Sequence, residues 1–311
     1  MAKNTDFRPK RSRPLFVSGR FSVGIKYLEL TKPKVTLLNM FVGVTCFLLA
    51  EIPSVNWELL AFFVAISYLS VGGSCVLNNY FDRDLDSAME RTSKRALPSG
   101  MVSPRRAAAL GLLMLSAGLS IACLIFGYLS TFIVFSGISV YVVVYTMWLK
   151  RYTRWGVIVG GISGSLAAVF GWVATGSVFA LVPLIVALLD FFWTPGHLWG
   201  YAIKNVADYS GAGVPMLPVV VGSARSSKYI LAFNATTIGL SFLFPILGIA
   251  GLLYTTVAAV TGFVLLRESL RLVKTPTHEQ AFRVFFASMP YLALIMLALL
   301  ADKLLYVSLA L

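Results

Sequence analysis

Three oxygen-bearing side chains recur at every fourth position in the first third of the chain: Asn78, Asp82 and Asp86. On an α-helix this spacing keeps side chains on one face, with a drift of about 40° per step. Carboxylate and amide oxygens suit a hard cation such as Mg²⁺. A basic cluster follows at once, formed by Arg91, Lys94 and Arg95. Metal-holding carboxylates beside such a cluster are what a diphosphate site needs.

The same stretch also fits a solvated, charge-mixed loop between helical ends, and its position decides between the two interpretations. The chain has only thirteen acidic residues, and four of them fall within nine positions here: Asp82, Asp84, Asp86 and Glu90. They follow directly on a run of about twenty mostly apolar residues. Because polar groups near hydrocarbon are costly and tend to be functional, we favour a site.

The composition predicts the elements that must position this site. The 311 residues are 58% hydrophobic and 13% charged, and the mean hydropathy is +0.82. Such a chain has too little polar surface for a soluble domain, and its apolar runs are too long for barrel strands. We predict an all-α polytopic membrane protein with nine transmembrane helices, near residues 35–50, 58–78, 107–127, 131–149, 157–176, 178–199, 229–248, 250–266 and 284–307. The first begins near Tyr27, with a kink or break at Pro33.

The distribution of positive charge predicts the orientation. With a cytoplasmic N-terminus, 25 of the 26 Lys and Arg residues fall in cytoplasmic segments, and Lys303 is the exception. The net charge of +13 is therefore an orientation signal, and we expect no nucleic-acid partner. Residues 1–26 are interpreted as a basic, disordered cytoplasmic tail rather than a signal peptide. Cys46, Cys75 and Cys123 are expected to be free.

A second polar stretch, residues 190–218, lies around the end of the sixth predicted span. Asp208 is a candidate metal ligand that returns from a different span, whereas His197 taken alone fits a satisfied interior histidine. Asp190 falls inside the span, where a functional and a hydrogen-bonded structural role are equally compatible with the sequence. The segment Leu30-Thr31-Lys32-Pro33-Lys34 is as compatible with a basic interface anchor as with a functional role. The loop with Lys150, Arg151 and Arg154 fits an orientation signal, and Gly156, Gly160, Gly161 and Gly164 favour helix packing over substrate contact.

Several blocks carry a resemblance to a known family. They are Asn78-x3-Asp82-x3-Asp86, Met89-x-Arg91-Thr92-x2-Arg95, Tyr145-Thr146 with Leu149-Lys150-Arg151, Gly160-Gly161, Gly171-Trp172, Trp193-Thr194-Pro195-x-His197, Asp208-Tyr209-x2-Ala212-Gly213-x-Pro215-Met216-Leu217-Pro218 and Arg283-x-Phe285-x2-Ser288-x2-Tyr291. From about Leu30 to the C-terminus, the chain resembles the protoheme IX farnesyltransferase (heme O synthase) branch of the UbiA superfamily of membrane prenyltransferases. It departs from that branch at Ala96, Gly156, Ala167, Ala168 and Gly196.

The resemblance implies one membrane prenyltransferase domain, residues 27–311, around a central cavity that opens to the cytoplasm. It implies a Mg²⁺ cofactor, with Asn78, Asp82, Asp86 and Asp208 as catalytic and metal-binding residues. Diphosphate would meet the cations Arg91, Lys94, Arg95, Lys150 and Arg151, while Trp172 and Trp193 line the cavity and His197 and Lys204 contact heme.

The implied reaction joins the farnesyl group of farnesyl diphosphate to the 2-vinyl group of protoheme IX, with addition of water. Heme B is then a substrate and not a prosthetic group, the enzyme lies in the cell membrane, and a heme A synthase is a possible partner. Another superfamily enzyme, acting on an aromatic, quinone-precursor or glycerol-ether acceptor, stays an alternative. A transporter is disfavoured, because we find no internal repeat.

Overall fold

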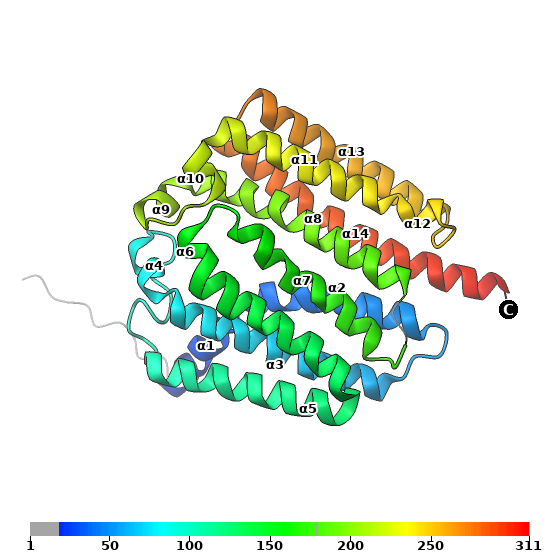
Figure 1. The fold of residues 1–311 in the computed structure, drawn as a ribbon, viewed down its shortest axis with the longest axis horizontal. Helices are drawn as coiled ribbons and strands as arrows, with labels where there is room; N and C mark the ends of the chain where they lie inside the picture. Colours follow the sequence, from blue (N-terminus) through cyan, green and yellow to red (C-terminus); the bar gives the residue numbers. More distant parts are fainter. Residues whose placement is uncertain (1–18, 178–179, 311) are drawn as a thin grey trace, which may run out of the picture.

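The computed structural model describes residues 19–177 and 180–310, and every regular element within these ranges is a helix (Figure 1). The long helices lie side by side, and they are α2 (Pro33–Glu51), α3 (Trp57–Phe81), α5 (Pro104–Ser139), α7 (Gly156–Val173), α8 (Leu181–Lys204), α11 (Ser223–Ser241), α13 (Leu252–Lys274) and α14 (His278–Ala310). The shorter ones are α1 (Gly19–Leu30), α4 (Arg83–Ala88), α6 (Lys150–Tyr152), α9 (Val206–Gly211), α10 (Leu217–Val221) and α12 (Leu243–Ile246).

Within the described residues, seven segments are long and apolar enough to cross a membrane: Pro33–Glu51, Trp57–Phe81, Pro104–Tyr152, Gly156–Val173, Leu181–Lys204, Ser223–Ile246 and His278–Leu305. The predicted count of nine is not confirmed. The predicted spans 107–127 and 131–149 share one segment, although the backbone leaves helical geometry at Gly127, where φ is 78°. The predicted span 250–266 belongs to α13, which is not among the seven because its last turns are charged.

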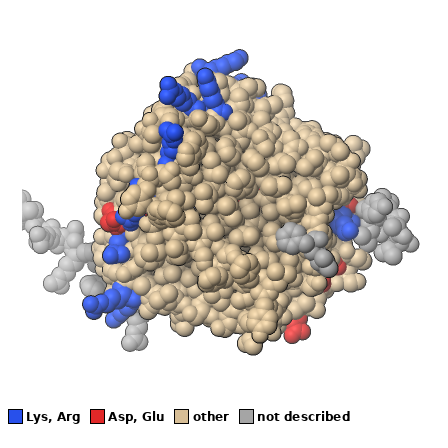
Figure 2. All heavy atoms as spheres, viewed as in Figure 1, with Lys and Arg blue, Asp and Glu red and all other residues tan. Residues whose placement is uncertain are grey.

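The bundle packs around two central helices. Helix α7 lies between α2 and α8, while α8 also packs against α11 and α14. The outer pairs are α3 with α5 and α13 with α14. The short helices α4, α6, α9 and α10 all gather at the left end of the bundle in Figure 1. Figure 2 shows most Lys and Arg side chains along that end and the top edge, beside a broad face without charge.

The chain enters the bundle through a break between α1 and α2. Lys32 has a left-handed backbone, with φ 48°, and Pro33 is the first residue of α2, so the predicted break at Pro33 is confirmed. The predicted disordered tail, residues 1–26, overlaps α1, because residues 19–26 are helical. The rest of that tail, residues 1–18, lies outside the described residues.

A π-helix, η1 (Val140–Leu149), links α5 to α6. Its hydrogen bonds reach five residues back instead of four. The Lys150 amide donates to the Tyr145 carbonyl, and the Thr146 hydroxyl donates to the Tyr141 carbonyl at 2.8 Å. This wider helix carries Tyr141 and Tyr145 and leads directly into α6, which begins at Lys150.

Candidate active site

The three residues of the predicted stripe share a buried face at the end of α3. Asp82 ends α3 and precedes α4, yet the Asp86 amide still donates to the Asp82 carbonyl at 2.7 Å, so helical register continues across the junction. The exposed fractions of Asn78, Asp82 and Asp86 are only 3%, 2% and 5%. Three polar residues are therefore held inside the protein at the point where an apolar helix ends.

Asp82 lies at the centre of a buried polar network. Its Oδ2 accepts hydrogen bonds from the Asn78 amide, at 2.9 Å, and from the Lys150 ammonium. The same Asn78 amide nitrogen also donates to Thr146 Oγ1 at 2.9 Å. The other carboxylate oxygen, Asp82 Oδ1, is buried without a hydrogen-bond partner among the described residues. Because an unpartnered buried oxygen is costly, this atom is free to accept a ligand.

Lys32 completes this network, and our sequence interpretation missed it. Its Nζ donates to Asn78 Oδ1 at 2.5 Å, so the side chain turns into the site instead of anchoring the surface. Burial lowers the pKa of Lys32, since the protein replaces the water around its ammonium. An incoming anion would favour the charged form of Lys32. The signal in the sequence was Lys before Pro, which disfavours α-helical backbone and breaks the helix here.

Asp84 lies on a different side of the junction from Asp82 and Asp86. Its carboxylate accepts two hydrogen bonds from Arg151, at 2.7 and 2.8 Å, and its side chain is 61% exposed. These hydrogen bonds lower the pKa of Asp84 to about 2. Arg151 also donates to the Phe81 carbonyl at 2.6 Å and so ties α6 to the end of α3. Asp84 and Arg151 therefore form a structural clamp beside the buried stripe.

The second polar stretch meets the first across 118 residues of sequence. The Glu90 amide donates to Asp208 Oδ1 at 3.3 Å, and Arg91 Nε lies 3.8 Å from Asp208 Oδ2. The Arg91 guanidinium also lies over the Tyr201 ring, 5.3 Å from its centroid. Asp208 thus faces the loop after Asp86. Lys94 lies on that loop and is exposed.

The acids are paired with cations in this structure. Arg95 donates to both oxygens of Asp86, at 2.9 and 3.1 Å, whereas Lys150 donates only to Oδ2 of Asp82. Among the described residues, no three His, Cys, Asp or Glu side chains are close enough to hold a metal ion together. The donor set still fits Mg²⁺, which commonly binds one or two carboxylates and takes its other ligands from substrate phosphates. The unpartnered Asp82 Oδ1 is the atom that offers such a bond.

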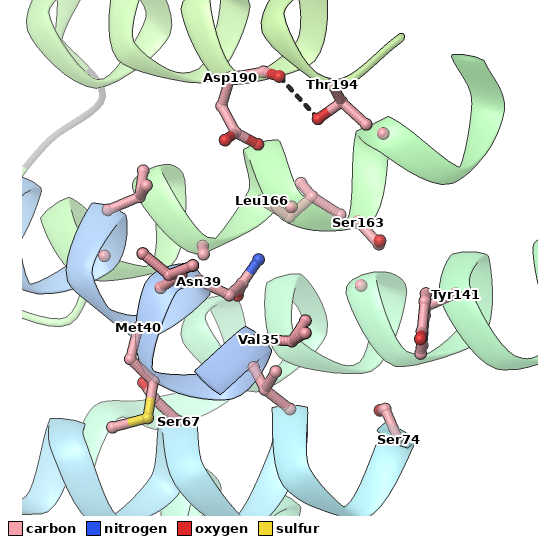
Figure 3. Close-up of a pocket in the computed structure, with 18 of the residues that line it drawn as sticks. Val35, Asn39, Met40, Ser67, Ser74, Tyr141, Ser163, Leu166, Asp190 and Thr194 are labelled. Atoms are coloured by element: carbon pink, nitrogen blue, oxygen red, sulfur yellow. Dashed lines mark hydrogen bonds between the residues drawn. The ribbon is translucent and has the colours of Figure 1, made fainter. Parts of the chain in front are cut away.

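An apolar cavity of about 360 Å³ lies inside the bundle, between α2, α3, α5, η1, α7, α8 and α14 (Figure 3). Ser74 and Cys75 line it one helical turn before Asn78, so the cavity ends close to the polar network. Gly160, Gly161 and Gly164 of α7 line the cavity and also let neighbouring side chains pack closely against the helix. A Cβ atom on Gly160 would lie 2.9 Å from the Tyr145 ring, and one on Gly161 would lie 3.4 Å from Thr194.

His197 lines the cavity with a fixed ring. It stacks between Trp193 and Phe285, with centroids 4.3 and 4.4 Å away. The Ser288 hydroxyl donates to the Phe285 carbonyl at 2.7 Å, so its oxygen accepts from His197 Nδ1, also at 2.7 Å. The proton therefore lies on Nδ1, and Nε2 keeps a lone pair. No described residue hydrogen-bonds Nε2, which leaves it available as a metal ligand.

Two predicted substrate residues lie elsewhere. Trp193 lines the cavity and donates to the Ser288 carbonyl at 2.8 Å, but Trp172 is not among the residues around the cavity. The α7 residues around the cavity lie between Val157 and Phe170, and Trp172 follows them in the last turn of the helix. Lys204 ends α8, where its Nζ lies 3.1 Å from the centroid of the Phe282 ring.

A helical membrane bundle whose apolar cavity ends at buried carboxylates and cations is the architecture of an intramembrane transferase for substrates with apolar tails and anionic heads. The chain belongs to the UbiA prenyltransferase family, whose model matches residues 37–298. It is thus a multi-pass membrane protein.

Similar proteins agree with this family. A protoheme IX farnesyltransferase 1 from Cenarchaeum symbiosum is 37% identical over 88% of this chain and 94% of its own length. One from Paramagnetospirillum magneticum is 39% identical over 89% and 98%. A solved structure concerning digeranylgeranylglyceryl phosphate synthase has a TM-score of 0.76 at 20% identity, covering 91% and 99% of the two chains. A UbiA homolog from Archaeoglobus fulgidus bound to GPP and Mg²⁺ has a TM-score of 0.65 at 18% identity, covering 89% and 99%. At these identities the structures establish the fold alone.

Proposed function

We propose that the protein transfers a farnesyl group from farnesyl diphosphate to the 2-vinyl group of protoheme IX, with addition of water, giving heme O and diphosphate. The names of relatives that are 37% and 39% identical support this reaction. The observation that carries it is the junction of an apolar cavity, lined by His197, with the buried network around Asp82. The network around Asp82 matches the head of a lipid diphosphate, and the cavity lined by His197 matches a metalloporphyrin.

The donor half lies at the junction of α3 and α4. Asp82 Oδ1 would bind Mg²⁺ first, with Asn78, Asp86 and Asp208 as the further oxygen donors. Bound Mg²⁺ would neutralise the charge that develops on the diphosphate as it leaves. Lys32 and Lys150 meet the diphosphate from inside the bundle, and the exposed cations of the loop and α6 meet it from outside: Arg91, Lys94, Arg95 and Arg151.

The acceptor half lies along α8. His197 Nε2 would bind the heme iron, and Trp193 and Phe285 hold the imidazole in position by stacking. The vinyl group then attacks C1 of the farnesyl group while the apolar wall excludes stray water. Lys204, at the end of α8, is suited to a heme propionate.

The orientation belongs to this proposal. We expect nine transmembrane helices. The segment Pro104–Tyr152 would cross the membrane twice, with a turn near Gly127, and α13 would cross once, which adds two crossings to the seven apolar segments. Support comes from 25 of the 26 Lys and Arg residues, which then lie on one side. In this orientation the enzyme lies in the cell membrane, and its N-terminus and the charged network face the cytoplasm.

Mass spectrometry of hemes from a host expressing this chain tests the reaction. A mass gain of one hydroxyethylfarnesyl group is expected, and it should disappear when Asp82→Asn replaces the wild type. Purified protein should release diphosphate from farnesyl diphosphate only with both heme and Mg²⁺, and chelation should stop release. A prenylated quinone precursor or glycerol ether, with unmodified heme, would refute the assignment of the acceptor.

A further inference from the structure

Asp190 is a buried acid that has no role in either half of the proposed site, the half that binds farnesyl diphosphate or the half that binds heme. It lies in the middle of α8, is 6% exposed, and is the only acidic residue among the described residues around the cavity. Its backbone carbonyl accepts a hydrogen bond from Thr194 at 2.8 Å (Figure 3). Its carboxylate has no hydrogen bond to any side chain in the described part of the chain. A carboxylate aimed into an apolar cavity without a protein partner calls for a polar ligand.

Asn39 of α2 faces this carboxylate across the cavity (Figure 3). Gly164 of α7 makes room for both groups. A Cβ atom on Gly164 would lie 2.7 Å from Asp190 Oδ2 and 3.4 Å from Asn39 Nδ2, so both polar groups converge on the bare Cα of this glycine. The Asp190 carboxylate, an acceptor, and the Asn39 amide, a donor, therefore lie close together at the wall of the cavity. An alanine at position 164 would push the carboxylate aside.

The space beside this pair suits a water molecule. A buried water needs little volume and two to four polar partners, and the cavity of about 360 Å³ provides far more than that volume. Asp190 would accept from the water and the Asn39 amide would donate to it. The nearby hydroxyl groups of Ser163 and Thr194 already donate to backbone carbonyls of their own helices, at 2.7 and 2.8 Å, so the Asp190 carboxylate and the Asn39 amide are the polar groups left to hold a water here.

The pair also lies within reach of the proposed acceptor. Asp190 and His197 are seven residues apart on α8, which places them on one helix face about 10 Å apart along the axis. Both side chains line the same cavity, in which His197 would hold the heme iron. On α7, Gly164 lies one turn from Gly160, which contacts the Tyr145 ring. Asp190 thus lies on the inner side of the site, away from the diphosphate.

We propose that Asp190 and Asn39 hold the water that becomes the hydroxyl group of the product, and that the Asp190 carboxylate takes its proton. This role rests on the proposed function. The vinyl π electrons form a bond to C1 of the farnesyl group as the bond from C1 to the diphosphate oxygen breaks. A carbocation is left on the carbon attached to the porphyrin. The water oxygen bonds to that carbon, and Asp190 accepts one water proton, which it later returns to solvent.

The product of Asp190→Asn tests this step. Without the carboxylate, the same carbocation should lose a proton from the neighbouring carbon and form a new carbon–carbon double bond, giving an alkene lighter than the alcohol by one water. We expect the ratio of alcohol to this alkene to fall at least tenfold, while total prenylated heme persists. Gly164→Ala should lower the same ratio, because it displaces the carboxylate without removing it. Ser67→Ala, another polar cavity residue on α3, should keep the wild-type ratio.

The outcomes separate this role from the reaction itself. If wild-type protein makes no prenylated heme, the proposed function fails. If wild type makes the alcohol and Asp190→Asn makes it at the wild-type ratio, Asp190 does not handle the water. If folded Asp190→Asn, shown by retained binding of farnesyl diphosphate, makes no prenylated heme, Asp190 acts before the new carbon–carbon bond and our proposal is wrong. If Asp190→Asn fails to fold, Gly164→Ala decides: an unchanged ratio refutes the proposal.

Discussion

Asp82→Asn and Asp84→Asn make the same chemical change two residues apart, and the structure predicts opposite results. Asp82 and Lys150 form a buried ion pair, with side chains 3% and 15% exposed. Removing one charge leaves the other buried, which typically costs about 3–5 kcal/mol. The Asp84 pair with Arg151 lies at the surface, where side chains are 61% and 28% exposed, and such pairs contribute about 0–1 kcal/mol. The stability difference should therefore be about 3 kcal/mol.

Activity should separate the two variants further. Asp82→Asn removes the carboxylate that faces the diphosphate site, and losing one preorganised electrostatic group typically lowers kcat about 10²–10³-fold. Asp84→Asn should stay within about threefold of wild type. Thermal unfolding in detergent measures stability, and release of diphosphate below both melting temperatures measures activity. The double variant Asp82→Asn with Lys150→Met removes the orphaned ammonium, so it should regain stability but not activity. An inactive Asp84→Asn beside a near-normal Asp82→Asn would refute this account.

Three further predictions follow from the contacts. Lys32→Met should raise the KM for farnesyl diphosphate about tenfold and leave heme binding unchanged, because Lys32 contacts only the donor network; equal losses for both substrates in titrations would contradict this. His197→Ala should abolish the heme absorbance shift on binding, and Ser288→Ala should weaken it less, with farnesyl diphosphate affinity kept in both; loss of that affinity instead would reject the division into halves. Reporter fusions at residues 90, 152, 215 and 275 should all report the cytoplasm, and an external result at residue 90 would reverse the orientation.

The features predicted best from the sequence depend only on the spacing and types of neighbouring residues. The stripe of Asn78, Asp82 and Asp86 follows from helical spacing, and the structure buries all three. The break at Pro33 follows from the conformational limits of the residues around proline. Both arguments need only a few neighbouring residues.

Features set by long-range packing could not be predicted from the sequence. The cations of the buried network come from distant segments: Lys32 donates to Asn78 across 46 residues and Lys150 donates to Asp82 across 68, and only the folded bundle brings them together. Whether Trp172 reaches the cavity depends on how far the cavity extends along α7, which only the packed bundle sets. The count of nine spans, drawn from hydropathy, is not confirmed, because the charged last turns of α13 lower its mean hydropathy and Pro104–Tyr152 forms one apolar segment.

The π-helix η1 limits the insertions and deletions that this segment of the chain can tolerate. In an α-helix, Lys150 would point about 180° away from Tyr141, since nine residues turn the chain by about 900°. Hydrogen bonds that reach five residues back unwind the helix and bring the two side chains to similar sides, so that Tyr141 lines the cavity while Lys150 reaches Asp82. Deleting one residue from Val140–Leu149 would rewind this helix and swing Lys150 away from its acid. In this segment, therefore, the number of residues is under tighter constraint than the identity of most of them.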